Sequence, residues 1–246
     1  MGTLPLEFRD GHLFIELSGE LWVFDTGAPN SLGASPNLTI AGEQFNLNGS
    51  YLGLDAELLS QFVGVTCAGL LGADVLGRFD HIVDIPRGAL TMSTDELSHS
   101  GQTVPLDEFM GIPIVTARIG DQDYRMFFDT GAQVSYFQDD LLATFPPSGV
   151  VSDFYPGVGQ FETDTFMVPF VLGEGAFSLR CGQLPDLLGM TLQMASVKGI
   201  VGNAILRVRN TPDLAPRFHG MRDPYSKRWG VRRKSWTTLE VVHVFL

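Results

Sequence analysis

Two identical five-residue segments, Phe-Asp-Thr-Gly-Ala, are the part of this chain whose residue types best suit catalysis. They occupy residues 24–28 and 128–132, so that Asp25 and Asp129 lie 104 positions apart. A given five-residue string recurs by chance at a rate of about 10⁻⁶ per position at average residue usage. The repeat therefore indicates an internal duplication, which supplies the chain with two equivalent carboxylates.

Two equivalent carboxylates can carry out general acid–base hydrolysis if the fold brings them together. Carboxylates about 3 Å apart cannot both ionise, so they share one proton. The ionised member accepts a proton from a bound water, and the protonated member donates to the carbonyl under attack. The neighbouring residues suit this task, because Gly27 and Gly131 lack a Cβ and let the loops approach. Thr26 and Thr130 offer hydroxyls that can bond across to the partner loop.

Further similarities follow the two segments in the same order. A serine lies six positions after each aspartate, at Ser31 and Ser135, and an apolar run precedes each aspartate. Downstream, Gly-Leu-Leu-Gly at residues 69–72 corresponds to Gly-Ile-Val-Gly at residues 199–202. This period is too long for a solenoid repeat, so each copy is expected to form a small domain or half-domain.

The elements that must position these loops are expected to be mostly short strands. The 246 residues include 28 Gly and 14 Pro, a turn-rich composition that favours many short strands. Runs rich in apolar and β-branched residues predict strands at residues 13–17, 21–24, 112–119 and 124–128. Short helices are expected at residues 55–62, 73–76 and 139–145. The pattern predicts the all-β fold class.

The two Phe-Asp-Thr-Gly-Ala-x-x-Ser loops, each followed by an apolar-apolar-Gly turn, resemble the pepsin–retropepsin superfamily of aspartic proteases. Ala28 and Ala132, where pepsin-type enzymes usually carry Ser or Thr, are similar to the retropepsin branch. Retroviral members are homodimers with one loop per chain, and this chain resembles a single-chain version with both halves fused. Over residues 10–217, the resemblance implies an all-β, two-lobed fold around a cleft for an extended peptide.

The resemblance also implies a role for each matching residue. Asp25 and Asp129 would be the catalytic pair, and the apolar-apolar-Gly turns would pack beneath their loops. The residues that clamp the two loops together would be Thr26, Gly27, Thr130 and Gly131. The tip of a flap that closes over the substrate would comprise Tyr155, Gly157, Val158 and Gly159.

Only the second copy is expected to supply a flap. Asp129 precedes Gly202 by 73 residues, whereas Asp25 precedes Gly72 by 47, which leaves 26 extra residues in the second copy. Residues 152–168 there predict a β-hairpin, because aromatic and β-branched residues flank a Pro-Gly-Val-Gly tip. The first copy has only a short polar segment at residues 46–50. A single flap on a fused chain predicts that the monomer is sufficient.

We expect three regions along the chain: an N-terminal retropepsin-like lobe at residues 1–100, a C-terminal lobe with the flap at residues 101–217, and a basic tail at residues 218–246. The similarity between the copies ends after Leu206. The structure of the tail is uncertain from sequence, although its β-forming residues 239–246 could add a strand between the lobes.

The charge of the chain is divided unevenly. Up to Leu206 there are 7 Lys+Arg against 25 Asp+Glu, whereas the remaining residues contain 9 basic and 3 acidic groups. An acidic body argues against nucleic acid as a partner, because phosphate binding needs clustered cations. The basic tail is interpreted as a solvated extension, with a nucleic-acid or membrane patch as the alternative.

The remaining patterns predict neither a cofactor nor a metal. Cys67 and Cys181 occupy non-equivalent positions in the two copies and are expected to be buried, inert thiols. The five histidines show no metal-ligand spacing. The N-terminal residues lack a basic, apolar leader, and no uncharged run reaches the ~18–20 residues of a transmembrane helix. A cytoplasmic location is therefore expected.

These observations predict an aspartic endopeptidase that acts on an extended polypeptide. The alternative is a catalytically inactive relative of the same fold that binds peptides or serves as a scaffold. A third reading is a protease fragment whose tail prevents a stable second lobe. The matched pair of carboxylates favours the enzyme, because an inert protein has no need of two carboxylates that repel each other.

Overall fold

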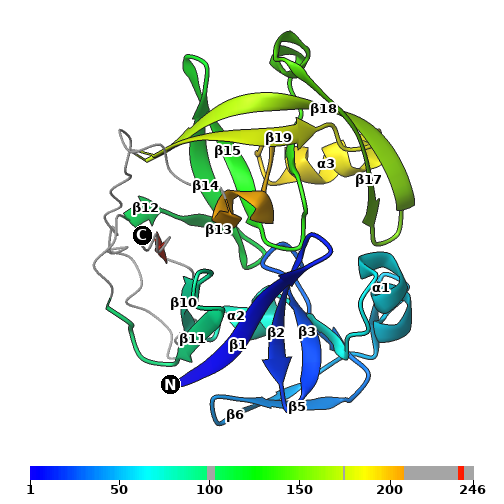
Figure 1. Cartoon of the computed structure of the whole chain (residues 1–246), viewed down its shortest axis with the longest axis vertical. Helices are drawn as coiled ribbons and strands as arrows, with labels where there is room; N and C mark the ends of the chain where they lie inside the picture. The colour runs from blue at the N-terminus through cyan, green and yellow to red at the C-terminus, as the bar shows by residue number, and fades with distance from the viewer. Residues whose placement is uncertain (99–102, 174, 208–237, 241–246) are drawn as a thin grey trace.

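The computed structural model describes residues 1–98, 103–173, 175–207 and 238–240, and most of these lie in β-strands (Figure 1). The elements of the first copy are β1 (Gly2–Arg9), β2 (His12–Leu17), β3 (Glu20–Phe24), β4 (Leu32–Gly33), β5 (Asn37–Ile40), β6 (Glu43–Asn46), β7 (Ser50–Tyr51), β8 (Leu54–Asp55), α1 (Ala56–Val63), β9 (Gly69–Leu71), α2 (Ala73–Leu76), β10 (Asp80–Asp84) and β11 (Ala89–Ser93). The expected all-β class is thus confirmed at the level of a mostly β structure.

The second copy has longer strands than the first. Its elements are β12 (Thr103–Pro105), β13 (Asp107–Phe109), β14 (Ile112–Ile119), β15 (Gln122–Asp129), β16 (Ser135–Phe137), the 3₁₀ helix η1 (Asp140–Thr144), β17 (Pro147–Tyr155), β18 (Gly159–Leu172), β19 (Gly175–Gly182), α3 (Asp186–Met194), β20 (Gly199–Gly202), the 3₁₀ helix η2 (Asn203–Arg207) and β21 (Thr238–Glu240). Helix α3 was not expected from the sequence, because Gly189 interrupts its apolar pattern.

Each copy forms its own main sheet, drawn below in blue to cyan and above in green to orange in Figure 1. The first sheet has the order β10-β11-β1-β2-β3-β9-β4, and the second has the order β13-β14-β15-β20-β16-β19-β18-β17. In both sheets the strand before the aspartate pairs in parallel with the strand of the Gly-apolar-apolar segment. Phe24 lies opposite Leu71, and Phe128 lies opposite Val201.

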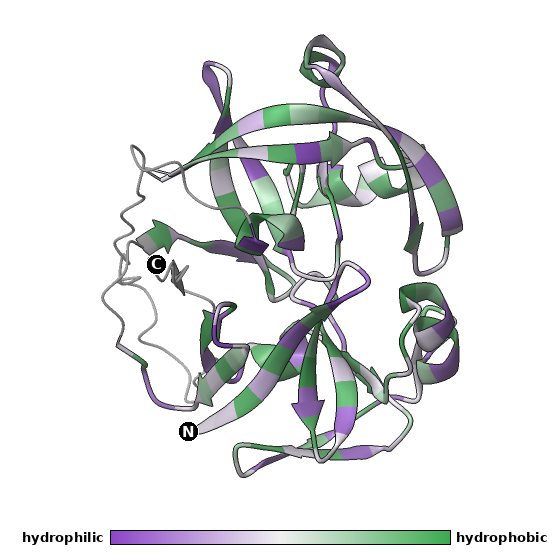
Figure 2. Ribbon diagram, viewed as in Figure 1, coloured by the Kyte–Doolittle hydropathy of each residue, from purple (hydrophilic) through white to green (hydrophobic). Residues whose placement is uncertain are grey.

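The strands form because apolar residues alternate with polar ones along them. In β14, buried and exposed positions alternate from Val115 to Ile119, as expected for a strand with one face on a core. Figure 2 shows hydrophobic and hydrophilic residues interleaved along β17 and β18. Separate clusters of buried side chains underlie the two sheets, so each copy has its own hydrophobic core.

Helix α1 forms one edge of the site described below. Its N-terminus is capped by the Asp55 carboxylate, which accepts a 2.8 Å hydrogen bond from the Leu58 N–H, and it ends at Gly64 with φ 72°. Leu59 and Val63, four residues apart, are buried on one face. The cap and this apolar face fix the helix against the sheet of the first copy.

The C-terminal part of the chain contributes one described strand. β21 pairs antiparallel with β12 in a separate two-stranded sheet, and Leu239 lies opposite Val104 in the register of this ladder. The β-forming character of residues 239–246 thus corresponds to a strand at its beginning, while residues 241–246 and the rest of the tail lie outside the described residues. Within the part of the chain that is described, no helix is long and apolar enough to cross a membrane.

Candidate active site

The two aspartates occupy equivalent turns at the ends of strands. Asp25 directly follows β3, and Asp129 is the last residue of β15. One carboxylate oxygen of each aspartate accepts hydrogen bonds from two backbone N–H groups, those of the glycine and the alanine that lie two and three residues after it. The N···O distances are 2.9 and 3.0 Å for Asp25, and 2.8 and 3.2 Å for Asp129. The backbone therefore holds both carboxylates in the same orientation.

The two loops are joined by a reciprocal set of hydrogen bonds. The Thr26 hydroxyl donates to the Phe128 carbonyl oxygen, and the Thr130 hydroxyl donates to the Phe24 carbonyl oxygen, both at 2.7 Å. Each hydroxyl also accepts the backbone N–H of the other threonine, at 3.0 and 3.1 Å. Both threonine side chains are buried. These four bonds give the pair of loops a near-twofold geometry that water does not reach.

The close approach of the loops requires glycine after each Asp-Thr pair. A Cβ atom on Gly27 would lie 2.1 Å from Cγ of Asp129, and one on Gly131 would lie 2.4 Å from Cγ of Asp25. Both distances are far below van der Waals contact, so no other residue fits without moving a carboxylate. The two glycines therefore set how near the carboxylates come.

The serines that follow the loops tie them to the glycine turns beneath. The Ser31 hydroxyl accepts the Gly72 N–H at 2.8 Å and donates to the Asp74 carboxylate at 2.6 Å. In the second copy, the Ser135 hydroxyl accepts the Gly202 N–H at 3.1 Å. Each loop is thereby anchored to the parallel strand pair behind it, which is rigid because it is buried.

The electrostatics of the pair favour one shared proton. Burial raises the pKa of Asp25 well above its usual range, and the charge of Asp129 and side-chain hydrogen bonding with it raise that pKa further. Burial also raises the pKa of Asp129, but hydrogen bonding with Asp25 lowers it. The two carboxyl groups therefore share one proton. The titration belongs to the pair as a unit.

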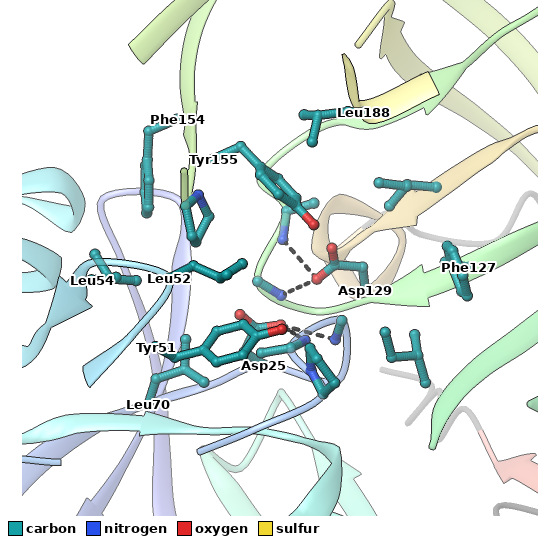
Figure 3. Close-up of a pocket in the computed structure, with 18 of the residues that line it drawn as sticks. Asp25, Tyr51, Leu52, Leu54, Leu70, Phe127, Asp129, Phe154, Tyr155 and Leu188 are labelled. Atoms are coloured by element: carbon teal, nitrogen blue, oxygen red, sulfur yellow. Dashed lines mark hydrogen bonds between the residues drawn. The ribbon is translucent and has the colours of Figure 1, made fainter. Parts of the chain in front are cut away.

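A cavity of about 220 Å³ opens around the two carboxylates, and both copies line it (Figure 3). The hydrophobic residues among those labelled in Figure 3 come from both copies: Leu52, Leu54, Leu70, Phe127, Phe154 and Leu188. A concave, mostly apolar site with a few convergent polar groups is typical of a binding site for an organic ligand.

The hairpin of β17 and β18 lines this cavity through Tyr155, whereas the other residues of the expected flap tip, Gly157, Val158 and Gly159, lie in its turn and are not among the lining residues. Tyr155 lines the cavity, and Figure 3 shows its hydroxyl directed toward Asp129. Burial, followed by the charges of Asp129 and Asp25, raises the pKa of Tyr155 to about 12. Gly157 and Gly159 adopt φ of 81° and 88° in the turn, and Val158 closes it with a 3.0 Å bond from its N–H to the Tyr155 carbonyl.

The first copy also has a hairpin at the cavity, which corrects the expectation that only the second copy would have one. β7 and β8 form a two-residue ladder, and Tyr51 and Leu52 at its turn line the cavity. The sequence held a signal for it: Tyr-Leu-Gly at residues 51–53 corresponds to Tyr-Pro-Gly at residues 155–157, again 104 positions later. The strands were too short for a periodic pattern to reveal them.

The equal Asp-to-Tyr spacing in the two copies also shows where the 26 extra residues of the second copy lie. Because both tyrosines lie 26 positions after their aspartates, the additional length must follow the turn of the hairpin. It is accommodated in the 14-residue β18 and in β19, which extend the second sheet and pair with each other from Phe166 to Leu172. The extra length therefore enlarges the sheet and supports the hairpin rather than forming its tip.

Three polar residues of the cavity wall were not expected from the sequence. They are His12 at the start of β2, Tyr136 in β16 and Asp153 in β17. They belong to no motif, and their separation along the chain gives no signal that they meet. The two cysteines are buried, as predicted, and burial raises the pKa of both Cys67 and Cys181. Among the described residues, no group of three His, Cys, Asp or Glu side chains could hold a metal.

Neither family models nor curated proteins provide a relative of this chain. No protein-family model matches the sequence, and no curated protein matches it at a significant level. The functional conclusion therefore depends on the geometry of the site.

Proposed function

We propose that this chain is an aspartic endopeptidase with the two-lobed fold of the pepsin–retropepsin superfamily. The observation that carries the proposal is the pair of half-buried carboxyl groups, Asp25 and Asp129, in equivalent loops that the hydroxyls of Thr26 and Thr130 join. Bringing two carboxyl groups together in a buried site costs stability, because each disfavours ionisation of the other. Such an arrangement is typical of a site that uses a shared proton.

In this proposal the two carboxyl groups divide the proton transfers of peptide hydrolysis. The ionised member of the pair removes a proton from a water between the two groups as the water oxygen attacks the peptide carbonyl carbon. The protonated member donates its proton to the carbonyl oxygen, which gives a tetrahedral gem-diol. The first carboxyl group then gives the proton it took from water to the amide nitrogen, a gem-diol hydroxyl returns a proton to the second, the C–N bond breaks, and the products are a carboxylic acid and an amine. The backbone N–H groups that hold each carboxylate keep it in place throughout.

The two hairpins serve to bind the substrate and exclude water. Tyr155 from the long hairpin and Tyr51 from the short one line the cavity over the two carboxyl groups. An extended peptide would pass between them and the aspartates, with alternate side chains entering the apolar walls. Removing bulk water strengthens the electrostatic interactions of the pair. All of these groups come from one chain, so a monomer suffices in this proposal.

The test is cleavage of an unfolded protein by wild type, Asp25→Asn and Asp129→Asn, with the exposed-loop variant Asp121→Asn as the matched control. We expect wild type and the control to cleave and both dyad variants to be inactive. A statine-containing peptide, which imitates the gem-diol, should inhibit the wild type. Specific peptide binding without cleavage by folded wild type would instead support the inactive peptide-binding relative.

A further inference from the structure

A third carboxyl group, that of Asp153, lines the same cavity. It lies in β17, two residues before Tyr155, so both side chains project from the same face of the strand. One carboxylate oxygen of Asp153 accepts the Phe154 backbone N–H at 2.8 Å, and the other accepts the hydroxyl of the buried Tyr136. Burial raises the pKa of Asp153, and the hydrogen bonds from Tyr136 and Phe154 offset part of that rise by stabilising the ionised form.

The neighbouring histidine does not neutralise this carboxylate. His12 Nε2 lies 2.8 Å from Nε2 of Gln133. An amide nitrogen only donates, so His12 Nε2 is the acceptor and the ring proton is on Nδ1. Burial lowers the pKa of His12 by more than the charge of Asp153 raises it, which also favours the neutral ring. His12 is therefore a neutral hydrogen-bonded group beside Asp153.

The described cavity wall also contains no lysine or arginine that could balance Asp153. The acidic groups of the lining are Asp25, Asp129 and Asp153. The surrounding wall is apolar, with Phe161 and Leu184 among its residues. A carboxylate in such a wall is costly unless a counter-charge pairs with it. Its two oxygens have about four acceptor positions, of which the two protein donors occupy two.

We propose that Asp153 is a specificity-determining residue that binds the ammonium or guanidinium group of a substrate Lys or Arg next to the scissile bond. This inference rests on the proposed peptidase function. The apolar wall suits the methylene stem of such a side chain, and the carboxylate suits its charged end. The position next to the scissile bond follows from Tyr155, which shares a strand face with Asp153. Tyr155 lies near enough to Asp129 and Asp25 that their charges raise its pKa.

The overall charge of the molecule agrees with a cationic substrate. Up to Leu206, 25 acidic residues outnumber 7 basic ones, which attracts basic polypeptides toward the site. Long-range attraction alone does not distinguish one subsite from another. The measurement must therefore separate a general preference for basic peptides from a charge effect at one position.

The experiment uses matched peptides that differ at one position at a time across the scissile bond, with Lys, norleucine or Glu at that position. Norleucine retains the stem of Lys and lacks its charge. We expect wild type to cleave the Lys peptide with a kcat/KM about tenfold above that of the norleucine peptide at one position, the effect of one charge-assisted hydrogen bond. Glu at that position should be the poorest substrate.

The variant Asp153→Asn should bring the Lys-to-norleucine ratio close to one. The matched control is Asp164→Asn, which removes an exposed carboxylate from the other strand of the same hairpin and should leave the ratio unchanged. Equal rates for Lys and norleucine at every position in wild type would overturn the inference while leaving the peptidase intact. A preference retained by Asp153→Asn would also overturn it. Absence of any aspartate-dependent cleavage would overturn the peptidase and the inference together.

Discussion

Phe154, in the long hairpin of the second copy, stacks on Phe62 in helix α1 of the first copy. Their ring centroids are 4.6 Å apart, and their planes meet at 22°. The hairpin therefore rests on the opposite half of the molecule while its Tyr155 lines the cavity (Figure 3). This contact stabilises the arrangement in which the cavity is covered.

We expect Phe62→Ala to weaken that cover without altering the two carboxyl groups. An aromatic pair contributes about 0.5–1.5 kcal/mol beyond its buried area. The value of kcat/KM should therefore fall by about two- to tenfold, and limited proteolysis should cut the hairpin more readily. The variant Phe62→Leu, which retains apolar contact, should lie between alanine and wild type. Unchanged kinetics and proteolysis in both variants would contradict a role for this stack.

Replacing either aspartate with asparagine should abolish hydrolysis and leave the fold intact. Neither carboxyl group can perform both proton transfers, so the losses from Asp25→Asn and Asp129→Asn should not add in the double variant. Turnover and circular dichroism would be measured on all three proteins. Substantial activity in a purified single variant would refute a shared catalytic pair.

Stability should depend on pH through the same pair. The folded pKa of Asp25 is raised, so the folded state binds its proton more tightly than the unfolded state does. This contribution is fully present below the unfolded pKa near 3.8, and it is lost as the pH rises toward the folded pKa. Asp25→Asn removes that dependence. Its melting temperature relative to wild type should therefore increase from pH 4 toward neutrality, and a constant difference would contradict the raised pKa.

Activity should show a bell-shaped pH profile with a weakly acidic optimum. The acidic limb reports protonation of the second carboxyl group, and the basic limb reports loss of the shared proton. Ala28 and Ala132 supply no hydroxyl to the aspartates, so the acidic limb should lie higher than in sites that contain one. The check is kcat/KM from pH 2 to pH 8. A plateau that extends down to pH 2 would count against this assignment.

The substitution Gly27→Ala should inactivate the protein. Its Cβ would lie 2.1 Å from Cγ of Asp129, so the loop or the carboxylate must shift. A displacement of about 1 Å in a catalytic group can reduce turnover by about 100-fold. Gly49→Ala is the matched control, because a Cβ there meets nothing within 4 Å. Comparable activity in the two variants would show that the spacing of the loops is not critical.

Removal of the tail should affect stability more than catalysis. Strand β21 pairs with β12, so truncation after Arg217 exposes that edge, whereas truncation after Glu240 retains the pair. We expect the first truncation to lower the melting temperature by a few degrees, the effect of about 1 kcal/mol in a chain of this size, and to retain cleavage. The second should match the full chain. Loss of cleavage in the shorter protein would assign the tail a part in the site.

The candidate site could be predicted from the sequence because the internal duplication is visible there without any structure. Two matched loops with serines and glycine turns at equivalent positions indicated a paired site, and the predicted strands around Asp25 and Asp129 are present as β3 and β15. The expected helices at residues 55–62 and 73–76 correspond to α1 and α2, and the cap and apolar spacing of α1 are local signals. The hairpin of Tyr51 also had a signal in the shared Tyr-x-Gly spacing.

Tertiary structure alone decided which distant groups meet. Thr26 and Thr130 are separated by 104 residues, and only the packing of the two sheets brings their hydroxyls to each other's loops. Asp153 has no counterpart motif, so its position in the cavity depends on the long pairing of β17 with β18. The reason is physical: periodicity and capping depend on neighbours within a few residues, whereas burial and charge depend on contacts that the whole fold creates.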